Sequence, residues 1–306
     1  MFLLVIHFLG GFGLPYPVIF EVTDEEPVAA GVYLEAPKDA VYKDGRLFIA
    51  DWRGGRLILA TEKGTQIIAK HGFGPGELKN YPSDLIIEDG YLFVFEWNWH
   101  VRSRFDLEGR YIDREKPSKE YRAMEGVAIR GYGFEGRIAH GHNFRYGDRC
   151  FFDPLSENTL LGDHLSRSMI DFGDDEILVL AKRTGAIATV TPDCAMDVRM
   201  KLNLLSFATD PIPSARTYVR YENKLTKTLR NGLPLIGLAV RDLGRAWVLI
   251  RNEHNEDRWL YALDIARGTI VFKHQLDAAF NRIRYNNGAL ILLAEDDAIV
   301  RCLKVE

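Results

Sequence analysis

Five short segments of this sequence combine aromatic, basic and histidine side chains, a mixture that is typical of a recognition surface. They span residues 51–55, 96–100, 141–146, 182–184 and 251–255. Aromatic rings offer rigid apolar area and arginine offers a fork of hydrogen-bond donors, so both are enriched where proteins bind partners. The side chains that we expect to contact a ligand are Trp52, Arg53, Trp97, Trp99, His100, His142, Arg145, Lys182, Arg183, Arg251 and His254.

Two of these tryptophans have a competing structural role. Trp52 and Trp97 lie 45 residues apart (52 to 97) in segments of similar sequence. Residues at equivalent repeat positions often pack between neighbouring repeats, and this is the alternative interpretation of the pair. Trp99 has no counterpart in the earlier segment, so it is the better candidate for an exposed binding residue.

Histidines in the same segments could also form a metal site. His140 and His142 are two residues apart, so on an extended strand both rings point to one side. His100, Glu96 or His254 would then have to complete the shell. Zinc needs three or four convergent ligands, and ordinary loop or core histidines are the competing interpretation. We therefore predict no cofactor and no metal, and keep Ca or Zn only as an alternative.

Motifs of known catalytic families are missing from the sequence. It lacks the G-x-S-x-G, H-E-x-x-H and P-loop patterns. The glycine-rich segment 72–76 is not followed by the lysine and helix of a phosphate cradle. We assign no catalytic residue.

The elements that position these segments repeat along the chain. Pro37-Lys38-Asp39 precedes Pro82-Ser83-Asp84 by 45 residues (37 to 82), and 48–52 precedes 93–97 by the same offset. A fixed offset of this size, filled with short apolar runs, indicates a repeat architecture.

Each repeat is predicted to be an antiparallel sheet of four strands. The first has candidate strands at 39–43, 46–50, 56–61 and 65–70, and the second at 83–88, 91–95, 100–106 and 110–113. Asp44-Gly45 and Lys63-Gly64 are typical hairpin turns because glycine tolerates positive φ. One such sheet cannot bury both faces alone, so copies must pack together.

Later segments of the chain show the same spacing of predicted strands. A third is expected at 126–163, a fourth at 168–202, a fifth at 235–274, and a last with only three strands at 282–304. A strand at 17–22 would supply the missing fourth, and this pairing would remove exposed sheet edges. The sequence therefore predicts an all-β fold, a six-bladed β-propeller of four-stranded antiparallel blades closed by pairing of its N- and C-terminal strands.

The first two repeats resemble the NHL repeat family. The family's lead Gly-x-Gly-Pro-Gly-Glu is present at 72–77, its Pro-x-Asp at 37–39 and 82–84, and its Gly-x-Leu strand at 45–51 and 90–96. The resemblance covers about 80 residues and implies a six-bladed propeller. It also implies an arginine five residues after the strand-ending acid, which is Arg56 in the first repeat. The second repeat has Val101 there and Glu96 as the acid.

Two functions are compatible with this fold. We expect a non-catalytic protein that binds a peptide, protein or glycan at the propeller mouth, because concave sites of this kind are the usual ligand positions. The alternative is a metal-dependent propeller enzyme of the lactone hydrolase or lyase type, which rests on analogy of fold alone. RNA binding, which the NHL resemblance also implies, is the weaker third option. A net charge of −4 argues against nucleic acid as the partner.

The predicted domain organisation is an apolar leader at 1–16 and a single propeller domain at 17–306. A helical insertion is expected at about 203–234, with Tyr218, Tyr221, Leu225 and Leu229 on one face and basic residues on the others. It is either a solvated helix that fills a gap or a flap that recruits an acidic ligand.

The compartment depends on the leader. Residues 2–9 have the length of a signal-peptide core, but no Lys or Arg occurs before Lys38. A truncated export signal would place the protein in the periplasm or outside the cell, and any other leader would leave it in the cytoplasm. Glycines and prolines interrupt the apolar run, so we expect no transmembrane span.

Cys150, Cys194 and Cys302 form no C-x-x-C motif and are expected to be buried. We expect a monomer.

Overall fold

The computed structural model describes residues 16–96, 101–115, 244–250 and 258–305 with their side chains, and Thr189 as well. Between 123 and 251 it also describes the backbone of the strands given below. These described residues form strands, turns and bends and contain no helix. The predicted helix at about 203–234, residues 1–15 of the leader predicted at 1–16, and the candidate strand at 159–163 lie outside them.

The first two repeats form two antiparallel sheets of four strands, as predicted. The first sheet contains β2 (Pro37–Lys43), β3 (Arg46–Asp51), β4 (Arg56–Thr61) and β5 (Gly64–Lys70). The second contains β6 (Pro82–Glu88), β7 (Tyr91–Glu96), β8 (Arg102–Asp106) and β9 (Tyr111–Glu115). The Asp44-Gly45 turn has φ values of 48° and 76°, which explains its glycine.

The C-terminal part of the chain forms two further four-stranded sheets. One contains β20 (Leu235–Asp242), β21 (Arg245–Arg251), β22 (Arg258–Asp264) and β23 (Thr269–Leu276). The other contains β24 (Arg282–Asn286), β25 (Ala289–Ala294), β26 (Ile299–Lys304) and β1 (Val18–Val22). Because β1 runs antiparallel to β26, strands from the two ends of the chain share one sheet.

The middle of the chain departs from the predicted regularity. One sheet contains β10 (Ala123–Met124), β11 (Val127–Arg130), β14 (Asn143–Tyr146) and β15 (Cys150–Phe152). A six-stranded sheet contains β12 (Phe134–Glu135), β13 (Ile138–Gly141), β16 (Ser168–Phe172), β17 (Ile177–Ala181), β18 (Ala186–Val190) and β19 (Met196–Lys201).

The predicted third repeat was therefore wrong in its pairing. The strand near 136–140 was expected beside 126–130, but β11 pairs with β14 and β13 pairs with β16. Three glycines within 131–136 permit tight turns. Strands β12 and β13 pair with each other as a short antiparallel pair, and β14 takes the place beside β11 that was expected for β13.

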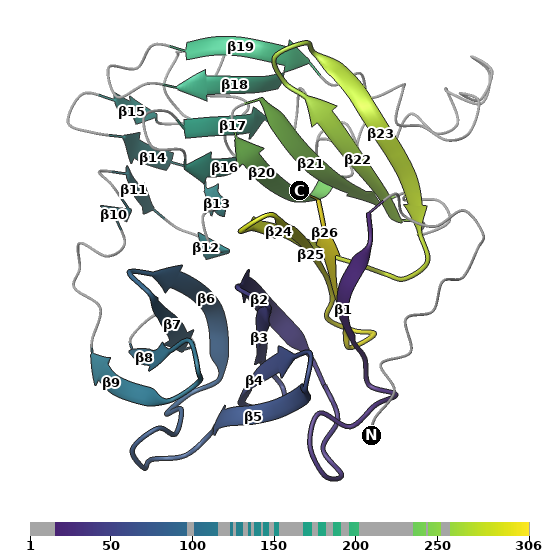
Figure 1. Ribbon diagram of the computed structural model, residues 1–306. Coiled ribbons are helices and arrows are strands. Elements are labelled where there is room, and N and C mark those ends of the chain that lie inside the picture. Colours follow the sequence, from purple (N-terminus) through teal and green to yellow (C-terminus); the bar gives the residue numbers. More distant parts are fainter. Residues whose placement is uncertain are drawn as a thin grey trace, which may run out of the picture.

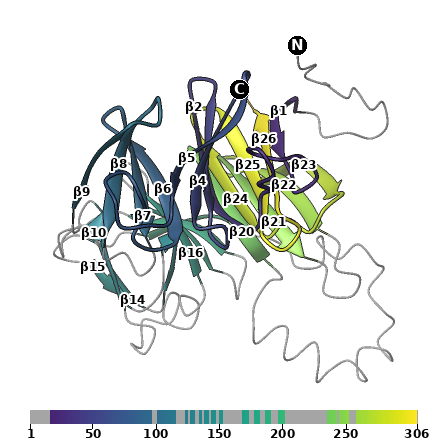
Figure 2. The same cartoon turned by 90° about the horizontal axis from the view of Figure 1, so that it is seen from below.

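The sheets are arranged around a common centre (Figure 1). Strand β2 lies beside both β6 and β24, and β24 lies beside β20, so the first strands of four sheets face inward. Figure 2 shows the same sheets from below, standing side by side. This radial arrangement of antiparallel sheets is that of a β-propeller.

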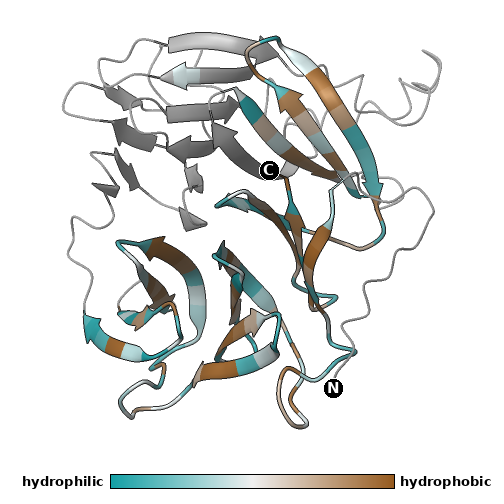
Figure 3. Cartoon of the chain, in the orientation of Figure 1, coloured by the Kyte–Doolittle hydropathy of each residue, from teal (hydrophilic) through white to brown (hydrophobic). Residues whose placement is uncertain are grey.

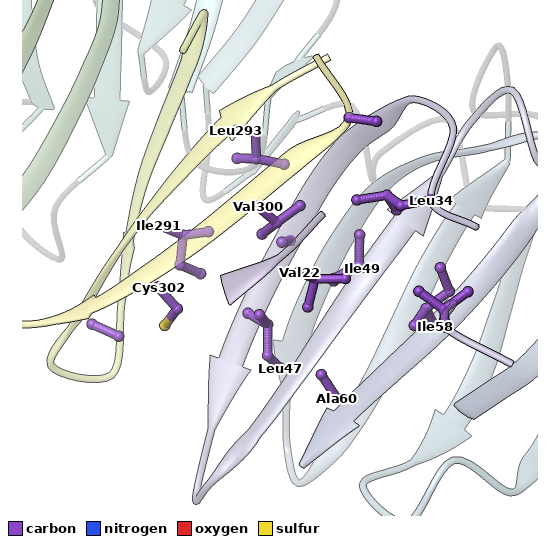
Figure 4. Packing of buried hydrophobic residues seen from close by; sticks show 14 residues of the cluster. Val22, Leu34, Leu47, Ile49, Ile58, Ala60, Ile291, Leu293, Val300 and Cys302 are labelled. Carbon is purple, nitrogen blue, oxygen red and sulfur yellow. The ribbon is translucent and has the colours of Figure 1, made fainter. Parts of the chain in front are cut away.

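The core lies between neighbouring sheets. Figure 3 shows apolar residues concentrated on the strands, with hydrophilic residues in many of the turns. The cluster in Figure 4 joins the first sheet to the last and includes Ile49, Ile58, Ile291 and Val300, all buried. Cys302 belongs to it, and burial raises the pKa of its thiol to about 12. Packing against both neighbours shelters the two faces that one sheet would expose.

Candidate functional site

The loops gather at two ends of the propeller. In an antiparallel sheet, the connections after the second strand and the links between sheets lie at one end, which we call the loop end. At the loop end the structure describes residues 52–55 and 295–298 and three links between sheets, 23–36, 71–81 and 277–281. The link 71–81 runs from β5 to β6. The hairpin turns at 44–45, 89–90 and 287–288 lie at the opposite end.

A buried carboxylate fixes the loop that carries Trp52. Asp51 is fully buried at the end of β3. Its Oδ1 accepts the backbone N–H of Ala36 at 2.9 Å, and its Oδ2 accepts Arg56 Nε at 3.0 Å. Arg56 also donates to the backbone carbonyl of Tyr33 at 2.8 Å. The interaction that the resemblance implied between this acid and the arginine five residues later is therefore present, and it ties the loop to the sheet.

Four aromatic rings follow one another across the loop end, and we call them the aromatic row. The ring centroids of Trp52 and Tyr81 are 5.4 Å apart. Those of Tyr81 and His71 are 5.6 Å apart, with the planes nearly parallel at 15°. Those of His71 and Phe73 are 6.2 Å apart in an edge-to-face arrangement. Such pairs contribute about 0.5–1.5 kcal/mol each beyond the area that they bury.

The aromatic row begins near the centre of the propeller. Lys38 is the second residue of the innermost strand β2, and its Nζ lies 6.0 Å from the centroid of Trp52. The same Nζ lies 3.3 Å from Glu295 Oε2 in the loop of the last sheet. Lys38 therefore places Trp52 where the first and last sheets meet.

The row ends at the periphery. His71 directly follows the outermost strand β5, and Phe73 is 83% exposed. Because the link 71–81 crosses from the outer edge of one sheet to the inner strand of the next, its aromatic residues lie along a radius of the propeller. Trp52 is half-buried, Tyr81 is 41% exposed, and together they offer ring surface to a ligand.

The second repeat builds the same support from different residues. Glu96 is fully buried at the end of β7. Its carboxylate accepts the backbone N–H of Asn80 at 2.7 Å and the hydroxyl of Ser103 at 3.0 Å. Arg114 Nε lies 3.5 Å from Glu96 Oε1. The arginine missing at Val101 is thus replaced by one from β9, which explains how this repeat departs from the family pattern.

Only some of the predicted site residues fall in the part of the chain that the structure describes. Trp52 packs against Tyr81, the last residue of the link to the second sheet. Arg53 is exposed. Arg145 lies within strand β14, so its predicted loop position was wrong, and Arg251 ends strand β21. The candidates outside the described residues are Trp97, Trp99, His100, His142, Lys182, Arg183 and His254.

Sequence reasoning missed four residues of the loop end: Lys38, His71, Phe73 and Tyr81. The segment 72–78 was interpreted only as an interblade turn that needs glycine. A phenylalanine between two glycines was the available signal, since a turn tip gives a large apolar side chain nothing to pack against.

Metal ligation stays untested for the predicted histidines. Among the described residues, no group of three or more His, Cys, Asp or Glu side chains converges. The side chains of His100, His140, His142 and His254 are outside that set.

No helix in the described part of the chain is long and apolar enough to cross a membrane.

Comparison with known proteins gives matches only among solved structures. No family model and no curated protein matches the chain. It is similar to a putative exported protein of Bacteroides fragilis, with 11% identity, 93% of each chain covered and a TM-score of 0.48. Streptogramin B lyase matches at 12% identity, with 93% and 96% covered and a TM-score of 0.44. The Cps50 (Swd1) β-propeller domain of Myceliophteria thermophila matches at 11% identity, with 95% and 100% covered and a TM-score of 0.49. These matches identify no ligand and no activity.

Proposed function

We propose that this protein is an NHL-like, six-bladed and closed β-propeller that acts as a non-catalytic recognition scaffold. It binds a peptide, protein or glycan at its loop end. The aromatic row is the observation that supports this proposal. Trp52 and Tyr81 offer ring surface beside Lys38, close to the propeller centre.

The support beneath the row favours binding because it holds the rings in place before a ligand arrives. Asp51 and Arg56 fix the Trp52 loop, and His71 stacks on Tyr81. Side chains that are already ordered lose little conformational entropy on binding, so more of the contact energy appears as affinity. Tryptophan and tyrosine also lead the residues that dominate binding energies at interfaces.

The remaining predicted residues would extend this surface around the mouth. Under the proposal, the loops after the second strands of the other sheets contribute Trp97, Trp99, His100, His142, Lys182, Arg183 and His254, with Arg145 and Arg251 at the strands beside them. Basic and aromatic side chains in these positions suit a ligand that combines an apolar group with acidic or hydrogen-bond-accepting groups.

Binding to peptide and glycan arrays tests this function. We expect the wild-type protein to select a small set of array members, and the Trp52→Ala/Tyr81→Ala variant to lose at least tenfold in affinity for them. The matched control is Tyr91→Ala, since Tyr91 is 37% exposed but lies at the opposite end of the second sheet. Selective binding that the double variant retains in full would contradict the proposal, as would no selective binding by the wild type.

A further inference from the structure

The outer end of the aromatic row is a protrusion, whereas a small-molecule site is usually concave. Phe73 is 83% exposed, and the other large hydrophobic residues that are exposed in the described part of the chain reach at most 52%. It lies between Gly72 and Gly74 at the tip of the loop 71–78. A protruding tip of this kind cannot enclose a ligand, so a partner would have to accommodate the Phe73 side chain.

The loop is held rigidly at its base. The backbone N–H of Leu78 donates to the carbonyl of Lys70 at 2.8 Å, and that of Gly72 donates to the carbonyl of Leu78 at 2.8 Å. Inside the loop, Glu77 accepts the N–H of Gly74 at 2.9 Å. Arg114 of β9 donates to the carbonyl of Glu77. The exposure of Phe73 is therefore built into the loop by contacts from both neighbouring sheets.

Basic residues lie at the base of this loop and on the loop beside it. Lys70 and Lys79 flank the base of the loop and are exposed, and Arg53 is exposed on the adjoining loop. The two loops touch, since the N–H of His71 donates to the carbonyl of Gly55 at 2.7 Å. Across 52–55 and 70–81, Glu77 is the one acidic residue in the sequence, and its carboxylate is turned inward to Gly74. Arg53, Lys70 and Lys79 are thus three exposed cations on the segments that carry or adjoin the apolar tip.

We propose that the loop 71–78 docks on the surface of a membrane that contains anionic lipids. Phe73 enters the interface between headgroups and acyl chains, and Arg53, Lys70 and Lys79 contact the headgroups. Phenylalanine, like tryptophan and leucine, buries at the boundary between headgroups and acyl chains, and each nearby basic residue adds attraction to an anionic surface. A bilayer accepts a convex tip without needing a matching pocket. The site adjoins the recognition surface, because its loop carries the outer rings of the aromatic row. The variants that test it leave Trp52 and Tyr81 unchanged, so either proposal can fail without the other.

Sedimentation with lipid vesicles tests the proposal on the full chain. Vesicles of phosphatidylcholine and phosphatidylglycerol at 7:3 are compared with vesicles of phosphatidylcholine alone, about 100 nm across in both cases. We expect the wild type to sediment with the anionic vesicles and to be released by high salt, because screening weakens surface attraction. The neutral vesicles should retain at least tenfold less protein.

Two variants separate the apolar and the charged contributions. Lys70→Gln/Lys79→Gln should lower the partition coefficient about 25-fold, since each surface lysine accounts for about a factor of five. Phe73→Ala should lower it about tenfold. The matched controls are Lys63→Gln/Lys304→Gln, two exposed lysines at the opposite end, and Val271→Ala on β23, and both should bind as the wild type does.

Three results would overturn the proposal. One is no sedimentation of the wild type with anionic vesicles. Another is binding that the loop variants leave unchanged. The third is binding of a Glu-rich peptide at Phe73 and the two lysines without any vesicle binding, which would assign the same tip to an acidic protein partner.

Discussion

The carboxylate of Asp39 in β2 accepts a hydrogen bond from the guanidinium of Arg284 in β24. The same oxygen accepts the backbone N–H of Leu85 in β6 at 2.7 Å. One carboxylate therefore joins the innermost strands of three sheets, the first, the second and the last. Asp39 is 7% exposed, so the interaction is shielded from water.

Removing this charge should destabilise the propeller. Asp39→Asn leaves the guanidinium of Arg284 without its carboxylate, and breaking a buried ion pair in this way costs about 3–5 kcal/mol. Urea unfolding should show this loss, with Asp44→Asn as the control because Asp44 is exposed in a turn with φ 48°. Asp39→Asn/Arg284→Met should recover part of the loss. Equal stability of Asp39→Asn and the wild type would show that the pair does not join the sheets.

Substitution of Gly55 should destabilise the fold by more than the positive φ at this position alone would cause. It has φ +61°, and a Cβ there would lie 3.1 Å from His71 Cβ and 3.6 Å from the ring of Tyr81. Gly45 has a similar φ of +76° but open space around it. Gly55→Ala should therefore lower the free energy of unfolding by more than Gly45→Ala and should also shift the near-ultraviolet circular dichroism of the aromatic row. Equal losses, with an unchanged spectrum, would mean that the row tolerates this displacement.

The ion pair between Arg301 and Asp277 should give acid sensitivity. Arg301 donates to Asp277 at 2.6 Å and to Glu21 of β1 at 3.1 Å. Burial acts to raise the pKa of Asp277, but the hydrogen bond and charge of Arg301 outweigh it, so the pKa lies below its usual value of 3.8. A lowered pKa stabilises the fold above about pH 4, and this contribution disappears as the pH falls through the folded pKa.

The wild type should therefore lose stability below about pH 4 more steeply than Asp277→Asn, which lacks the titrating group. Chemical unfolding between pH 2.5 and pH 6 measures the two slopes. The control is Asp296→Asn, in an exposed loop of the same sheet. Parallel curves for the wild type and Asp277→Asn would rule out this contribution.

The sheets could be predicted where local sequence decides them. Asp44-Gly45, Asp89-Gly90 and Asn287-Gly288 all have positive φ at both residues, so the turn residues alone fix these hairpins. The alternation of apolar residues then determines which face of each strand is buried. Prediction failed for the third repeat, where β14 and not β13 pairs with β11. Which of two neighbouring segments joins a sheet depends on tertiary packing more than on local sequence.

The candidate site was harder to predict because its contacts join different sheets. Tyr81 meets Trp52 across 29 positions of sequence (52 to 81), and no local period relates them. Glu96 likewise takes its arginine from position 114 and not from 101, because β9 lies beside β8. Trp52 and Arg53 could be identified from the sequence by their residue types. Their contacts could not, because these depend on how consecutive sheets pack.

Hydrogen–deuterium exchange with and without the best ligand from the arrays tests the recognition surface most directly. We expect the ligand to slow exchange at 52–55 and 71–81, at the loop end. Exchange at the turns 44–45, 89–90 and 287–288 should not change. Protection of those turns, with no change at 52–55 and 71–81, would contradict this expectation.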